Sequence, residues 1–171
     1  MDMFRRLRAT GPSFLVPMAW AFVTAAHFDF VSTHAVFVAH VVMVVLLAGF
    51  AVTGRDDMRT GVLRVWWYVI AVGVFVTLAG LIGFQVDAMS AVLWGTSLCG
   101  WMFLPAVGFV YTARRVSEGA WIYTAGTVAC LVGVTLYVAG VVGGNLIVQV
   151  SGLVVVGIGQ TAGILDATVR Y

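Results

Sequence analysis

Three histidines are the side chains of this sequence best suited to chemistry, and all three lie in its N-terminal part. His27 stands near the end of one apolar stretch and His40 stands inside the next, while Asp29 and His34 lie around the turn between them. An imidazole exchanges protons near neutral pH and binds transition metals or haem iron. We therefore expect any ligand, proton-transfer or metal site to use His27 and His40, with His34 or Asp29 beside them.

Three interpretations of His27 and His40 remain open. They bind a transition metal or transfer a proton, they ligate a haem, or they are neutral and hydrogen-bonded to Thr24, Asp29 or the backbone. Neighbouring helices pack about 8–10 Å apart, so a haem held between them would need a third helix to open the pair. We expect that the protein binds no cofactor, with haem or a transition metal as the alternatives.

The sequence contains no other motif that would indicate enzymatic catalysis. The chain has no lysine, which excludes a Schiff base, and it contains no HExxH or CxxC motif. Its two cysteines, Cys99 and Cys130, lie in apolar stretches, where a free cysteine usually serves as a small buried packing residue. Asp166 stands one helical turn before Arg170 and is expected to pair with it. We therefore expect a protein that is not an enzyme.

The composition indicates which elements must position these residues. Hydrophobic residues make up 62% of the chain and charged residues only 9%, against about 25% charged residues in soluble domains. Residues 35–53 and 120–165 contain no acidic or basic side chain other than a histidine. Because about 20 apolar residues cross about 30 Å of hydrocarbon, we expect an all-α, polytopic transmembrane bundle that forms one integral membrane domain over residues 1–171. The expected spans are 13–28, 33–53, 65–84, 88–111, 120–143 and 145–165.

The arginines predict the orientation of these six spans. All nine basic residues are arginine, and each lies before the first span, after the last, or in every second connection. They are Arg5, Arg6, Arg8, Arg55, Arg59, Arg64, Arg114, Arg115 and Arg170. The positive-inside rule then places both termini in the cytoplasm and leaves three helical hairpins, whose short turns face outward. Residues 5–26 also resemble a signal peptide, but we expect them to remain as the first span.

Small residues at helical spacing predict which faces of the helices point inward. Lipid gives apolar helices no hydrophobic drive to associate, so close backbone contact through small residues takes over. Three stripes have this spacing: Gly73, Thr77 and Gly80; Gly126, Cys130, Gly133, Tyr137, Gly140 and Gly144; and Gln149, Gly152, Val156, Gln160 and Gly163. Gln149, Gln160, Thr24 and Thr77 are the polar side chains expected inside. They either hydrogen-bond between helices or line a polar path.

These patterns lead to a functional expectation. We expect a small non-enzymatic protein of the cell membrane that acts as a transport or channel-like unit or as a subunit of a membrane complex. The alternatives are a haem- or metal-binding redox protein that uses the outer histidines, and a structural or signalling partner without a ligand. The expected partners are the lipid bilayer and either further copies of the chain or a larger membrane complex. Because topology accounts for the arginines, we expect no nucleic-acid partner.

Overall fold

The computed structural model describes residues 2–170, and it describes their side chains except those of residues 2–10 and 12. Helices account for all of the regular secondary structure in these residues. In chain order they are α1 (Asp2–His27), α2 (Thr33–Thr53), α3 (Gly61–Ile82), the 3₁₀ turn η1 (Asp87–Met89), α4 (Ser90–Ala113), α5 (Ala120–Val142) and α6 (Leu146–Arg170). The side chains of Arg5, Arg6 and Arg8, which contribute to the expected orientation, lie outside the described residues.

Five of these helices, α2 to α6, are long and apolar enough to cross a membrane. The apolar part of α1 within the described side chains, Ser13–His27, falls in a shorter class of 10–17 residues. Many large apolar side chains point away from the bundle; Phe75, Val142 and Ile147, for example, are each more than two-thirds exposed. Such surfaces are stable in hydrocarbon but not in water. The helices therefore fit a multi-pass membrane protein.

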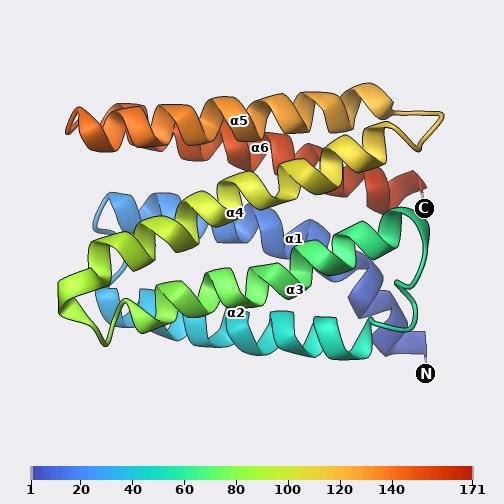
Figure 1. Ribbon diagram of the computed structural model, residues 1–171, viewed down its shortest axis with the longest axis horizontal. Coiled ribbons are helices and arrows are strands. Elements are labelled where there is room, and N and C mark those ends of the chain that lie inside the picture. The colour runs from blue at the N-terminus through green and yellow to red at the C-terminus, as the bar shows by residue number, and fades with distance from the viewer. Residues whose placement is uncertain (1, 171) are drawn as a thin grey trace.

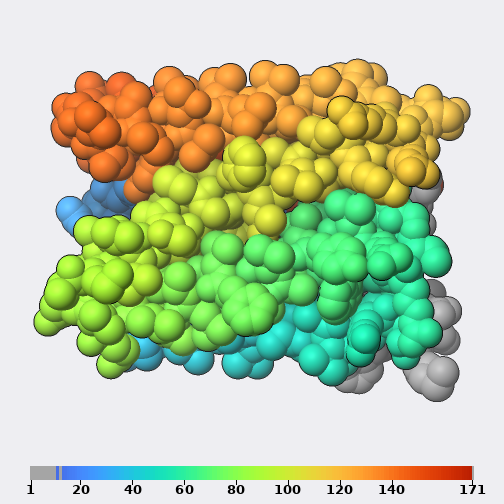
Figure 2. Space-filling view, in the orientation of Figure 1, coloured from blue at the N-terminus to red at the C-terminus, as the bar shows by residue number. Residues whose placement is uncertain are grey.

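The helices run side by side along the long axis of the molecule, with both chain ends at the same end of the bundle (Figure 1). Neighbouring helices follow the chain from α2 to α6, because α2 packs on α3, α3 on α4, α4 on α5, and α5 on α6. The contact between α5 and α6 is the most extensive, and α1 packs chiefly against α6. On the face drawn in Figure 2, α3, α4 and α5 form a continuous surface.

Helices α3 and α4 interlock because each inserts side chains over glycines of the other. A Cβ atom at Gly73 of α3 would lie 2.5 Å from the ring of Trp101 in α4. In the opposite direction, a Cβ at Gly108 of α4 would lie 3.0 Å from the ring of Trp66 in α3. A side chain at Gly73 would therefore force the Trp101 ring to move, and one at Gly108 would press on the Trp66 ring, so both glycines favour the close approach of these two helices.

Helices α5 and α6 make the closest backbone contact of the bundle. A Cβ at Gly152 of α6 would lie 2.7 Å from the backbone nitrogen of Tyr137, and one at Gly140 of α5 would lie 2.5 Å from that of Gln149. Glycines 126, 133 and 140 of α5 are buried, as are glycines 152 and 163 of α6. The predicted inward faces of α3, α5 and α6 are thus confirmed, apart from Gly144 and the half-buried Tyr137 and Gln149.

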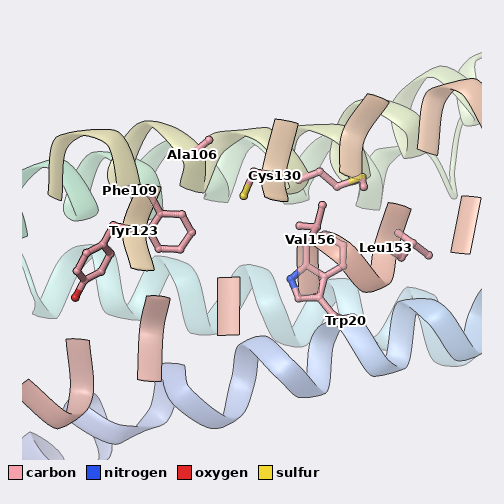
Figure 3. Packing of buried hydrophobic residues seen from close by; sticks show 8 residues of the cluster. Trp20, Ala106, Phe109, Tyr123, Cys130, Leu153 and Val156 are labelled. Carbon is pink, nitrogen blue, oxygen red and sulfur yellow. The ribbon is translucent and has the colours of Figure 1, made fainter. Parts of the chain in front are cut away.

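The apolar core lies where α4, α5 and α6 meet α1 (Figure 3). Its fully buried members are Met102 and Phe109 from α4, Tyr123 and Cys130 from α5, and Leu153 and Val156 from α6. The side chain of Tyr123 is buried beside Phe109, with the two ring centroids 6.1 Å apart.

Helix α2 is the least buried helix, with Leu47 as its only buried residue among those described. Its sequence is rich in valine and leucine and has no stripe of small residues. Because lipid contact is as favourable as protein contact for such side chains, nothing draws α2 closely onto α1. Helix α1 packs on α6, where Gly157 makes room for Trp20.

Candidate functional site

A buried glutamine lies at the centre of the most extensive polar network in the described residues. Gln160 of α6 is only 3% exposed. Its side-chain oxygen accepts a hydrogen bond of 3.0 Å from the indole nitrogen of Trp20 in α1. Its amide nitrogen donates to the backbone oxygen of Trp101 in α4 at 3.0 Å and to Sγ of Cys130 in α5 at 3.6 Å. One amide group therefore links four helices.

The backbone oxygen of Trp101 is available because of a proline one turn later. Pro105 lies inside α4, and proline has no N–H to donate to the carbonyl four residues earlier. In a membrane an unbonded carbonyl is costly, and a side chain from a neighbouring helix commonly replaces the missing donor. Gln160 supplies that donor, so the proline and the glutamine form a matched pair.

Trp101 extends the network to a fifth helix. Its indole nitrogen donates to Oγ1 of Thr77 in α3 at 2.8 Å, and that hydroxyl donates to the backbone oxygen of Gly73 at 2.8 Å. Thr77 is 3% exposed. The sequence predicts Gln160 and Thr77 as interior polar residues, and the structure joins them through Trp101.

The network consists of neutral groups, and its amide, indole and hydroxyl donors all have partners within the protein. Interhelical hydrogen bonds of this kind contribute about 0.6–2 kcal/mol each in a membrane. Because amide, indole and hydroxyl groups do not change charge near neutral pH, the arrangement can hold helices together but is poorly suited to moving protons.

The other two predicted interior polar residues lie away from this network. Gln149 donates a long hydrogen bond of 3.3 Å to the backbone oxygen of Gly140, which ties the end of α5 to the start of α6. Thr24 lines a shallow, mostly apolar groove of about 750 Å³ between α1 and α6, together with Thr161. Gln160 does not line this groove.

His27 connects the end of α1 to the C-terminal part of α5. Its Nδ1 lies 2.8 Å from the backbone oxygen of Val23 and its Nε2 lies 3.1 Å from the hydroxyl of Tyr137. A carbonyl oxygen only accepts, so Nδ1 carries the proton and, in the neutral ring, Nε2 accepts from Tyr137. The two rings meet edge to face, with centroids 5.6 Å apart.

His40 packs against a different part of the bundle. Its Nδ1 donates to the backbone oxygen of Val36 at 2.9 Å. Its Nε2 and Oγ of Ser97 each lie 2.7 Å from the point that a Cβ on Gly80 would occupy. The imidazole thus lies over the α3 backbone, and Phe84 contacts it edge to face with ring centroids 5.4 Å apart.

The structure does not bring the four candidate residues into one cluster. His27 contacts α5, whereas His40 lies over Gly80 of α3 and against Phe84. His34 stacks on Phe37, with centroids 6.5 Å apart, and Asp29 is an exposed turn residue with a φ of 57°. Within the described residues, no group of three or more histidine, cysteine, aspartate or glutamate side chains is close enough to hold a metal ion.

Ion pairs gather at the end of the bundle that holds both chain ends. Arg170 donates to Asp166 at 2.6 Å, which confirms the predicted pair, and it also reaches Glu118 in the α4–α5 loop at 3.3 Å. Arg59 pairs with Asp56 on the exposed α2–α3 loop. These contacts fasten loops and helix ends rather than forming a pocket.

Comparison of the chain with protein-family models, curated proteins and solved structures gives no match. The class of protein therefore follows from the helices themselves, five of which are long and apolar enough for a multi-pass membrane protein.

Sequence reasoning missed three residues that complete these contacts: Trp20, Trp101 and Pro105. It placed Tyr137 on the inward stripe of α5 but did not pair it with His27. Pro105 offered a signal, because a proline inside a span predicts an unbonded carbonyl at Trp101. The tryptophans offered none, since an aromatic residue in an apolar stretch is as readily a packing or lipid-facing residue.

Proposed function

We propose that this chain is a non-enzymatic, multi-pass protein of the cell membrane that serves as a subunit of a membrane complex. In this proposal all six α-helices cross the bilayer as three hairpins, and both termini lie in the cytoplasm. The positive-inside pattern of the arginines supports the orientation, and the shared location of the two chain ends in Figure 1 supports an even number of crossings.

The observation that carries the proposal is the closed bonding of Gln160. A polar residue that lines a solute path keeps donors or acceptors for that solute. Both amide hydrogens of Gln160 point at protein acceptors, and its oxygen accepts from Trp20. Glycines at the α3–α4 and α5–α6 contacts bring the backbones together with little space between them. A tightly bonded interior supports a scaffold better than it supports a channel.

The outer surface supports a role in assembly. Large apolar side chains cover most of the outward faces of α2 and α5, including Val45, Val52, Val128, Leu131 and Val138. These surfaces can contact lipid or the helices of another subunit equally well. A protein without a chemical site of its own would act through such contacts.

Two measurements test this proposal. Proteoliposomes containing the purified chain should pass protons, potassium and water no faster than vesicles without protein. Native electrophoresis of mildly solubilised membranes, with the chain tagged and produced at its natural level, should show a particle larger than the purified chain alone. The proposal would be contradicted if vesicles with the chain passed any of these solutes faster than empty vesicles. It would also be contradicted if the chain from native membranes migrated at the same position as the purified chain.

A specific observation favours one second candidate, a metal- or haem-binding redox protein. Metal-binding histidines usually donate the N–H of their other ring nitrogen to a carbonyl or carboxylate. His27 and His40 both do so, through Val23 and Val36, and each presents Nε2 to a neighbouring helix. Elemental analysis and a visible spectrum of the purified protein test this candidate. A stoichiometric metal or a Soret band that is lost in His27→Ala or His40→Ala would support it.

A further inference from the structure

Two arginines on neighbouring helices lie at the same end of the bundle. Trp66 of α3 donates a 3.1 Å hydrogen bond to Oγ1 of Thr112 in α4, which fixes how these antiparallel helices are aligned. Arg64 lies two residues before Trp66, and Arg115 lies three residues after Thr112. Both are therefore at the level where α3 begins and α4 ends, and both are exposed.

Tyrosines hold both guanidinium groups. The guanidinium carbon of Arg115 lies 5.0 Å from the centroid of the Tyr111 ring. Arg64 donates to the hydroxyl of Tyr68 at 3.3 Å, and its guanidinium carbon lies 5.8 Å from the centroid of that ring. Each guanidinium is thus held by a tyrosine four residues away in the chain.

No carboxylate neutralises either cation among the described side chains. The ion pairs found there are formed by Arg59 with Asp56 and by Arg170 with Asp166 and Glu118. Two guanidinium groups at the same end of neighbouring helices, neither of them paired with a carboxylate, attract an anion. The two arginines thus favour a negative group at this end of the bundle.

The depth of this arrangement indicates which anion it meets. Arg64 and Tyr68 occupy the first two turns of an apolar helix, and Tyr111 occupies the last turn of another. Tyrosine and arginine at such helix ends lie at the level of lipid headgroups. Planar guanidinium groups donate pairs of hydrogen bonds to phosphate oxygens, and a tyrosine hydroxyl can add a further donor.

We propose that Arg64 and Arg115, framed by Tyr68 and Tyr111, bind the phosphate of an anionic phospholipid headgroup. The lipid's acyl chains would then run beside α3 and α4. This inference depends on the helices lying in a bilayer, but not on whether the chain is a subunit of a complex.

The test uses the full chain in detergent micelles that contain phosphatidylglycerol or phosphatidylcholine, and counts retained lipids by native mass spectrometry. The wild-type protein should retain phosphatidylglycerol in preference to phosphatidylcholine. The double variant Arg64→Gln/Arg115→Gln should lower the retention of phosphatidylglycerol by about tenfold, because each arginine near the surface contributes separately to the attraction of an anionic lipid. Arg64→Lys should keep only part of it, because an ammonium cannot form the paired hydrogen bonds.

The matched control is Arg59→Gln, which removes the same charge from an arginine already paired with Asp56. Retention in this control should stay within about twofold of wild type. An equal loss in the control and in the Arg64→Gln/Arg115→Gln variant would overturn the proposal, because only overall charge would then matter. If millimolar inorganic phosphate displaced the lipid, the site would bind free phosphate rather than a lipid headgroup, and the proposal would be wrong. Melting curves in phosphatidylcholine alone should match for all variants, which separates lost binding from lost folding.

Discussion

Gln160 of α6 donates a hydrogen bond to the backbone oxygen of Trp101 in α4, the carbonyl that Pro105 leaves without its helical partner. The bond compensates for a defect in one helix with a side chain from another. It also explains why a costly polar group and a helix-breaking residue occur together in so apolar a chain.

Replacing the glutamine tests how strongly this bond contributes to folding. Gln160→Leu keeps a similar volume but leaves the Trp101 carbonyl and the Trp20 N–H without partners. We expect the free energy of unfolding to fall by about 1–2 kcal/mol, measured by denaturant titration in micelles. Gln149→Leu is the control, because the Gln149 side chain is half-buried and makes one long hydrogen bond. This substitution should lower the free energy of unfolding clearly less than Gln160→Leu does.

A double-mutant cycle tests the link to the proline. Pro105→Ala restores an N–H that can bond the Trp101 carbonyl within α4, so Gln160→Leu should cost less in the Pro105→Ala background than in the wild type. The expected coupling is about 0.5–1.5 kcal/mol. Additive effects of the two substitutions would show that Pro105 and Gln160 are unrelated.

Glycines at helix contacts should differ sharply from glycines that face open space. Gly73→Ala places a methyl group against the Trp101 ring and should destabilise the fold by about 1–3 kcal/mol, with a loss of the Trp101–Thr77 hydrogen bond. Gly95→Ala in the adjoining helix meets no atom within 4 Å and should leave the thermal midpoint unchanged or slightly raised. Similar midpoints for the two variants would argue against the α3–α4 packing.

The contact between His27 and Tyr137 should behave as a single interhelical hydrogen bond. Tyr137→Phe and His27→Phe each remove it, and each should lower the free energy of unfolding by about 1 kcal/mol. The double variant should cost less than the sum of the two, because the bond can be lost only once. Amide exchange near the end of α1 should rise in both single variants. Unchanged exchange would contradict the contact.

Cysteine labelling in intact cells tests the proposed orientation. In a chain whose Cys99 and Cys130 are changed to alanine, Thr60→Cys and Ser117→Cys should resist a membrane-impermeant thiol reagent. Gln85→Cys, on the connection from α3 to α4, should react. Protection of Thr60→Cys together with labelling of Ser117→Cys would place the α2–α3 and α4–α5 loops on opposite sides and refute the orientation.

The all-α architecture and much of the inward faces of α3, α5 and α6 could be predicted from the sequence. The bounds of α2, from Thr33 to Thr53, match the prediction, because hydrophobic length and the charged loops that follow are local properties of the chain. The stripe of Gly73, Thr77 and Gly80 identified a buried face for the same reason. Helical periodicity decides which residues share a face before any partner is known.

Which helices pack against one another could not be predicted from the sequence. Because α1 and α2 are joined by a short turn, they would be expected to pack on each other, yet α1 packs on α6. Gly157 of α6 leaves room for the Trp20 side chain, whereas the valine-rich surface of α2 offers no comparable recess. That choice separates His27 from His40 and brings Gln160 between Trp20 and Trp101. Partner choice depends on the shapes of all the helices at once, and spacing along a single helix does not contain that information.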